Sequence, residues 1–450
     1  MRWPGALLIL ICGSSGCAPL VELARPQPVL SGGWSAGNRD GAQPATNVAE
    51  MLGSPELAGL IASALRDNPD IAIASARVDQ ARAGLRAARA SGDPLVSLSL
   101  AGRTGASAGA GSGTRTINGE AAVDLAWTPD LSGRRAAERR AEGARAVAAA
   151  HDRDAVRLLI ETELARAFVQ HAALGARIAL VDRSLASARE LARVIGVRQR
   201  LGAATRVETG LQSIEVRQLE VERTRLVQAQ HRVRNAMAVL AGTEPPLFTA
   251  PGAQLSGLQV PALAPAQPAV LLSRRPDVRA AEARIAAANG DVDVARRSFI
   301  PDPVLSIGAA STLLAGPLGA AASIGGDLLA PIFNRGRLRA GLDLASATQR
   351  EAVETYRRTL LQALREVEDA LGDTGQSQQR RDLLMLSLDE ARVTAQLARR
   401  QYIEGYADLQ RVLEAEAGLI EVEDGAVLAA EDRLQAAVDL YRAMGGAPTS

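Results

Sequence analysis

The sequence predicts a mostly helical protein that also carries two β-hairpins of the membrane type. Its fold class is set by a unit of roughly 200 residues that occurs twice, since Asn68-Pro69-Asp70 is answered by Arg275-Pro276-Asp277. Two long stretches, 130–244 and 332–447, contain no proline and are rich in strong helix formers. Ahead of each stretch, apolar residues alternate with polar or small ones, which is the period of a β-strand. The predicted class is therefore mostly α with a membrane β-part and a twofold internal repeat.

The repeat divides the chain into segments. We expect a leader, an extended N-terminal segment, a first repeat, a proline-rich linker, a second repeat and a short tail, at residues 1–16, 17–53, 54–244, 245–274, 275–446 and 447–450.

The N-terminus indicates export from the cytoplasm. Met1-Arg2 is basic, the apolar run that follows is too short to span a bilayer, and small residues precede Cys17. This leader resembles a bacterial lipoprotein signal, so Cys17 is the predicted lipidation site and outer-membrane lipid the expected contact of its acyl chains. Ser14 stands where such signals usually have leucine, and ordinary cleavage that leaves Cys17 free is the alternative. No cysteine follows Cys17, so no disulfide is expected.

The two predicted hairpins lie at about 95–127 and 303–333. In each, one face is apolar and the other is polar or small, as in a transmembrane β-strand between lipid and water. The apolar positions include Val96, Leu98, Leu100, Val123, Leu125, Leu305 and Ile307. A soluble hairpin with one face on a core is the alternative. If the hairpins insert, oligomerisation follows, because open sheet edges cannot face hydrocarbon.

The ends of the hairpins carry aromatic residues and prolines. If all helices lie on one side of the membrane, three aromatic residues share one interface, where rings favour the headgroup layer: Trp127, Phe299 and Phe333. Prolines are expected where a strand meets a helix, because the backbone there needs no N–H to donate to the sheet. These residues are Pro94, Pro129, Pro303 and Pro331.

Each proline-free stretch reads as two long antiparallel helices. From Arg134 to Leu201, about 68 residues at 1.5 Å each give a rod on the order of 100 Å. The turns are predicted near Gly202 and Gly405, because glycine tolerates the backbone that ends a helix. Many core-type positions are alanine, which permits close approach and favours coiled-coil packing within a larger closed assembly.

Composition argues against several functions. All 51 basic residues are arginine and the net charge is +1, which gives no nucleic-acid footprint. His151, His171 and His231 have no metal-motif spacing, and no nucleophile elbow or phosphate loop is present. We therefore expect neither an enzyme nor a cofactor.

Taken together, these motifs resemble the TolC-type outer-membrane factor family, nearest its NodT-like lipoprotein branch. The resemblance rests on the order of the leader, the repeat, the Pro-Asp helix starts, the Gly-Arg helix starts after the hairpins and the terminal Leu440–Gly446, and it covers about Ser54 to Gly446. It implies a homotrimer with a twelve-stranded barrel in the bacterial outer membrane, four strands from each chain, above a long α-helical barrel in the periplasm.

The resemblance also implies a passive exit duct. Its partners would be a periplasmic adaptor and an inner-membrane pump of the resistance-nodulation-division type. A duct for type I protein secretion is a variant of this reading. A periplasmic coiled-coil scaffold or adaptor that never enters a bilayer is an alternative of another class, although it leaves the alternating strands unexplained.

A gate is implied just past the second tip glycine. Three copies of Glu414 would form a carboxylate ring, and Asp408 and Arg411 are candidates for the links that hold it. Arg206 and Glu208 are the first-repeat counterparts. The family's arginine one turn further is Ala417 here, and ordinary solvated helix charges are the alternative at each position.

Overall fold

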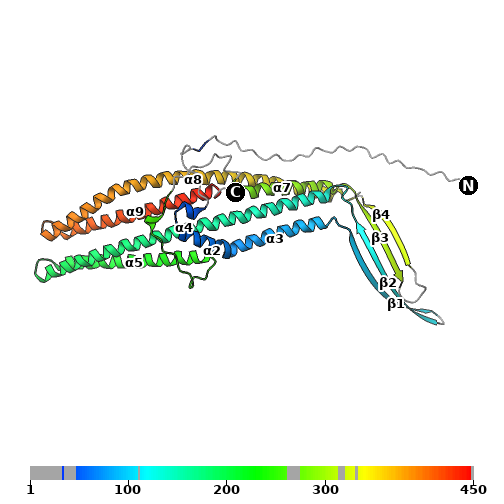
Figure 1. Ribbon diagram of the computed structural model, residues 1–450, viewed down its shortest axis with the longest axis horizontal. Coiled ribbons are helices and arrows are strands. Elements are labelled where there is room, and N and C mark those ends of the chain that lie inside the picture. The colour runs from blue at the N-terminus through cyan, green and yellow to red at the C-terminus, as the bar shows by residue number, and fades with distance from the viewer. Residues whose placement is uncertain are drawn as a thin grey trace.

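The protein is a long helical rod with a β-sheet that leaves one end of the rod at an angle (Figure 1). The computed structural model describes residues 33–34, 47–109, 112–260, 274–312, 320–329 and 333–446. The leader, Cys17, most of the 17–53 segment, part of the linker, Pro331 and the 447–450 tail lie outside the described residues.

The two repeats follow the same order of elements. The first runs through α3 (Pro69–Ala90), β1 (Leu95–Gly109), β2 (Ser112–Trp127), α4 (Arg134–Arg200) and α5 (Arg206–Leu240). The second runs through α7 (Pro276–Arg297), β3 (Asp302–Thr312), β4 (Ala320–Leu329), α8 (Arg335–Glu404) and α9 (Leu409–Ala443). Outside this correspondence lie α1 (Val48–Met51), α2 (Pro55–Asp67) and the 3-10 helix η1 (Leu255–Gly257).

The predicted rods are present. Helix α4 has 67 residues and α8 has 70, each without an internal proline. One stretch of α4 is apolar enough to cross a bilayer by composition, but half of it is buried. Helices α3, α5, α7 and α9 pack against α4, so the apolar stretch is explained by helix packing.

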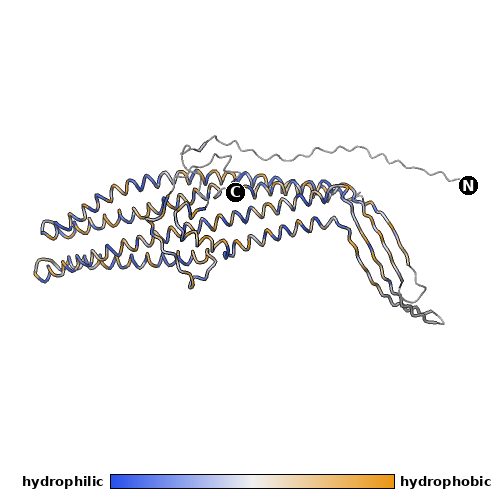
Figure 2. Tube along the Cα trace, in the orientation of Figure 1, coloured by the Kyte–Doolittle hydropathy of each residue, from blue (hydrophilic) through white to orange (hydrophobic). Residues whose placement is uncertain are grey.

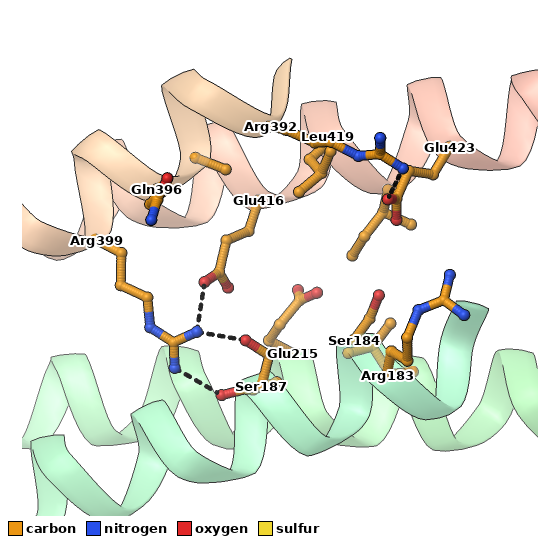
Figure 3. A pocket seen from close by; sticks show the side chains of 14 residues that line it. Arg183, Ser184, Ser187, Glu215, Arg392, Gln396, Arg399, Glu416, Leu419 and Glu423 are labelled. Carbon is orange, nitrogen blue, oxygen red and sulfur yellow. Dashed lines mark hydrogen bonds and ion pairs between the residues drawn. The ribbon is translucent and has the colours of Figure 1, made fainter. Parts of the chain in front are cut away.

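At the end of the rod far from the sheet, the long helices form two hairpins. The first helical hairpin consists of the distal half of α4 with α5, and the second consists of the distal half of α8 with α9. The helices carry apolar residues in stripes between hydrophilic ones (Figure 2). The two hairpins face each other across a cavity lined by all four helices (Figure 3).

The main core lies at mid-rod, where α5 and α9 end and α1 and α2 pack (Figure 1). It includes Trp34, Leu57, Phe168, Met237 and Tyr441, all buried. Large side chains are concentrated here, whereas alanine fills many of the buried positions elsewhere in the rod.

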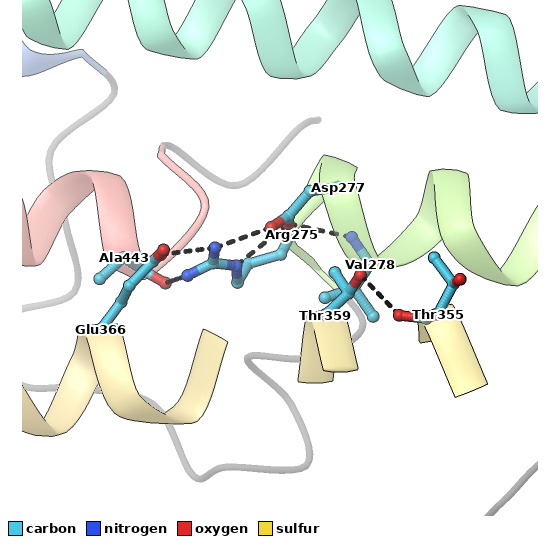
Figure 4. Close-up of polar contacts among 7 residues, drawn as sticks. All are labelled: Arg275, Asp277, Val278, Thr355, Thr359, Glu366 and Ala443. Atoms are coloured by element: carbon cyan, nitrogen blue, oxygen red, sulfur yellow. Dashed lines mark hydrogen bonds and ion pairs between the residues drawn. The ribbon is translucent and has the colours of Figure 1, made fainter. Parts of the chain in front are cut away.

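A buried arginine joins three helices at this level (Figure 4). Arg275 is 6% exposed, and its Nη2 lies 2.8 Å from Asp277 Oδ2 and 2.7 Å from Glu366 Oε2. Its Nη1 donates to the carbonyl of Ala443, the last residue of α9, at 3.0 Å. Burial alone would lower the pKa of Arg275, but the two carboxylates outweigh burial and raise that pKa above its usual value. Arg275 therefore fixes the root of the second helical hairpin.

The first repeat has an equivalent contact between the end of α5 and the start of α3, made by an uncharged side chain. Asn68 caps α3, and its Nδ2 donates to the carbonyl of Leu240, the last residue of α5, at 2.8 Å. Gly242 follows with φ +71°, and a Cβ there would lie 2.3 Å from the carbonyl oxygen of Asp67. Gly445 occupies the same place in the second repeat, with φ +84°. The duplicated sequence has thus kept a duplicated contact.

Three boundaries differ from the sequence prediction. The predicted extended N-terminal segment contains the single helical turn α1, because the Asn47 side chain accepts a hydrogen bond from the Glu50 N–H and starts it. The second hairpin begins at Asp302, one residue before the predicted start at 303, so Pro303 is the second residue of β3. β2 pairs with β3 only from Leu305 onward. The missing N–H of Pro303 therefore costs no hydrogen bond between β3 and β2. β4 ends at Leu329, and Phe333 lies just before α8 and not in a strand.

Candidate functional site

The four strands form one antiparallel sheet in the order β1-β2-β3-β4. Register pairs Leu98 with Val123 and Ile307 with both Leu125 and Ile324, so these apolar residues share one face. The opposite face carries small or polar residues: Ser97, Ser99, Ala122, Asp124, Ser306, Gly308, Ser323 and Gly325. Among the described residues no helix packs on the sheet, and its apolar side chains are largely exposed. One face therefore suits lipid and the other suits water.

The sheet of a single chain has two unpaired edges. β1 and β4 each pair with one neighbour only in the described chain. Such edges expose unpaired N–H and C=O groups, which cannot remain exposed in hydrocarbon. The soluble-hairpin alternative loses its basis, because no core lies under the apolar face of the described strands.

The junction between rod and sheet holds the predicted aromatic residues and prolines. Trp127 ends β2, and its Nε1 donates to the carbonyl of Gly92 at 3.2 Å. Phe333 is 100% exposed, and Phe299 lies between α7 and β3. Pro94 directly precedes β1, and Pro129 lies between β2 and α4. The role of the three rings at a membrane interface stays a prediction.

Both tips turn through the predicted glycines. Gly202 has φ +73° and Gly405 has φ +87°, the left-handed conformation that favours glycine. Each following helix begins with a side-chain cap. Thr205 and Glu208 form a reciprocal capping box on α5, and Asp408 accepts from the N–H of Arg411 at 3.0 Å on α9.

A tyrosine that sequence reasoning missed links the two tips. Tyr402 is 2% exposed, and its hydroxyl donates to Glu208 Oε1 at 3.3 Å, joining α8 to α5. Arg198 of α4 stacks 4.7 Å from the centroid of the Tyr402 ring and donates to its carbonyl at 3.0 Å. The backbone N–H of Thr205, then the Thr205 and Tyr402 hydroxyls, hydrogen-bond the carboxylate and hold the pKa of Glu208 below its usual value. The sequence feature that could have indicated Tyr402 is its position three residues before a tip glycine, in a chain with only four tyrosines.

A second link crosses between the hairpins further from the tip. Arg399 of α8 donates through Nη1 to Ser187 Oγ and through Nη2 to the Ser187 carbonyl of α4, the latter at 3.2 Å. Its Nη1 also lies 3.9 Å from Glu416 Oε1 of α9. No local sequence pattern indicates this contact, because residues 187 and 399 are far apart along the chain.

The gate residues predicted from sequence lie at the tips, and their part in a gate stays a prediction. Asp408 contacts the backbone of Arg411 and not its guanidinium. Glu414 accepts from Gln410 Nε2 at 2.9 Å within α9, and both Arg411 and Glu414 are exposed in the single chain. Arg206 is the first residue of α5 and is exposed. Only Glu208 takes part in a described contact between the two hairpins.

The described residues offer no obvious chemical centre. His151 and His171 lie in α4 and His231 in α5. No group of three or more His, Cys, Asp or Glu within the described ranges is arranged to hold a metal.

A rod of paired long helices that continues into a one-sided apolar sheet with open edges is the subunit of an outer-membrane channel. The chain belongs to the outer membrane efflux protein family, whose model matches residues 60–243 and 268–446. It is 33% identical over 457 residues to the pyoverdine export outer membrane protein OpmQ of Pseudomonas aeruginosa, covering 98% of this chain and 95% of that protein. It is 30% identical to outer membrane protein OprJ of the same organism, covering 98% and 94%.

Solved structures agree with this assignment. The outer-membrane channel OprN is similar with a TM-score of 0.83 and 27% identity, over 91% of this chain and 94% of that one. The predicted fold class and the prediction of an outer-membrane efflux component are thereby confirmed, and the alternative of a scaffold that never enters a bilayer is excluded.

Proposed function

We propose that three copies of this chain form a closed channel that is the passive exit duct of a tripartite efflux system. The other components would be a periplasmic adaptor and an inner-membrane pump of the resistance-nodulation-division type. The observation that carries the proposal is the four-stranded sheet with one apolar face and two unpaired edges. The export and efflux roles named for its relatives favour efflux over type I protein secretion.

Closure follows from the strand edges. If β1 of one copy pairs with β4 of the next, three copies give a closed barrel without free edges. The small and polar face then lines the lumen, and the apolar face meets lipid. The pump supplies the energy, and the channel supplies a continuous aqueous path.

Apolar side chains on the helical surface support assembly with further copies. In the single chain, exposed apolar residues recur along two helices: Val207, Leu211, Ile214 and Val221 on α5, and Leu383, Leu386, Val393 and Leu397 on α8. Rows of apolar side chains exposed to water are unfavourable, and neighbouring copies would cover them.

Conduction through the purified protein tests the duct. We expect discrete, water-filled conductances when the detergent-extracted protein is added to planar lipid bilayers. Absence of conductance from protein that is folded and membrane-inserted would contradict the proposal.

We place the periplasmic gate at the helical tips. Tyr402 with Glu208, and Arg399 with Ser187, hold the first and second helical hairpins together inside one chain. Opening must separate some of these contacts. Glu414 and Arg411 lie on the exposed side of α9, where a threefold carboxylate ring would form.

Tyr402→Phe should open the gate more often. It removes one hydrogen bond to a carboxylate and keeps the ring under Arg198, so a loss of about 1 kcal/mol, or roughly fivefold in the open-to-closed ratio, is expected. Single-channel recording measures this ratio. Tyr406→Phe is the matched control, because Tyr406 is exposed at the same tip. An equal open-to-closed ratio in Tyr402→Phe and the parent would mean that the gate lies elsewhere.

We also propose that Cys17 carries the lipid anchor. The barrel spans the membrane and the acyl chains tether it, so Cys17→Ser should fold normally but assemble less efficiently. Incorporation of radiolabelled palmitate measures acylation. A parent protein without label would mean that Ser14 disables the signal.

A further inference from the structure

The cavity between the two helical hairpins (Figure 3) has a volume of about 330 Å³. Its walls come from α4 and α5 on one side and from α8 and α9 on the other. Any movement that separates the hairpins must widen this cavity.

Six charged side chains line the cavity, three of each sign. They are Arg183 from α4, Glu215 from α5, Arg392 and Arg399 from α8, and Glu416 and Glu423 from α9. Arg392 pairs with Glu423 at 3.4 Å within the second helical hairpin. Arg399 reaches across to Ser187 and lies 3.9 Å from Glu416. Glu215 and Glu416 therefore lie on opposite hairpins, with Arg399 as the cation that bridges from one hairpin to the other.

Glu416 is held in conditions that disfavour its charge. Burial raises the pKa of Glu416 above its usual value, Arg399 opposes that rise, and Glu215 adds to it. The contact with Arg399 is too long to be a strong ion pair, and that guanidinium is already hydrogen-bonded to Ser187. Separation of the hairpins would expose Glu416 to more water and move the Glu215 carboxylate away.

We propose that this cavity is a proton-linked joint, in which separation of the two hairpins is coupled to release of a proton from Glu416 and mild acid holds the helical end closed. The sign follows from linkage. The closed arrangement binds the proton more tightly than the open one, so it gains stability as the pH falls through the raised pKa. The gain is complete below the ordinary pKa of glutamate and is absent well above the raised value. The proposal rests on the proposed channel function only in taking hairpin separation as the opening step.

The test uses the full-length protein at pH 5.5 and pH 7.5. Nitroxide labels are attached at Gln218→Cys on α5 and Thr394→Cys on α8, because both positions are exposed. Pulsed electron paramagnetic resonance then measures the distance between the two hairpins. We expect the shorter distance to gain population at pH 5.5, by at most about tenfold for each unit by which the Glu416 pKa differs between the two states. Open probability in bilayers should fall in parallel.

Three variants separate this joint from general acid effects. Glu416→Gln should favour the shorter distance at both pH values and should lose the pH response. Glu215→Gln should move the response to lower pH, because it removes the carboxylate that adds to the rise. Glu421→Gln, exposed on the same helix, should respond like the parent.

The outcomes distinguish the joint from the channel. A distance distribution that does not change with pH, or an unchanged pH response in Glu416→Gln, overturns the joint. A distance that responds to pH in a protein that never conducts supports the joint and contradicts the duct.

Discussion

Leu100→Arg is expected to abolish assembly in the membrane. Leu100 is exposed on the apolar face of β1, opposite Ala121 of β2. An arginine on the lipid face costs up to about 2–4 kcal/mol in each chain, and a symmetric assembly of three copies incurs that cost three times. The measurement is the amount of assembled protein in isolated outer membranes.

Ser99→Arg is the control, because Ser99 is the adjacent residue on the opposite face of the same strand. In a closed barrel that face meets water, so Ser99→Arg should assemble and alter conductance only. Equal loss of assembly in the two variants would mean that the sheet does not have one lipid face and one water face.

Gly242→Ala should cause the largest loss of stability among the glycines of the helical rod. Its φ of +71° costs an alanine about 1–2 kcal/mol, and the new Cβ would lie 2.3 Å from the Asp67 carbonyl oxygen. Relief of that overlap adds about 1–3 kcal/mol and must push α5 away from the start of α3. Thermal unfolding of the detergent-solubilised protein, followed by circular dichroism, measures the change.

Gly372→Ala provides the comparison for this substitution. Gly372 lies inside α8 with open space around it, so alanine should raise stability by about 0.5–1 kcal/mol through helix propensity. If Gly242→Ala unfolds at the same temperature as the parent, the end of α5 and the start of α3 are not packed closely enough to exclude a Cβ.

The elements were predictable because their signals are local. Alternation at Val96, Leu98 and Leu100 places those side chains on one face whatever the rest of the chain does. The tips were equally predictable, because Gly202 and Gly405 interrupt long proline-free stretches and adopt the left-handed conformation there. Short-range pattern was sufficient at these positions.

The contacts between hairpins were not predictable in the same way. Tyr402 and Glu208, like Arg399 and Ser187, are about two hundred residues apart, and a single sequence carries no periodicity that pairs them. Asp408 accepts a hydrogen bond from the backbone N–H of Arg411, because a residue at the start of a helix faces the unpaired N–H groups of the first turn. Its role in a gate between copies stays a prediction.

The oligomeric state tests the central claim most directly. Native mass spectrometry of the protein extracted from membranes in mild detergent should give three times the mass of the lipidated mature chain, with no monomer at assay concentrations. A monomer that stays soluble without detergent would leave both sheet edges unpaired and would contradict the channel.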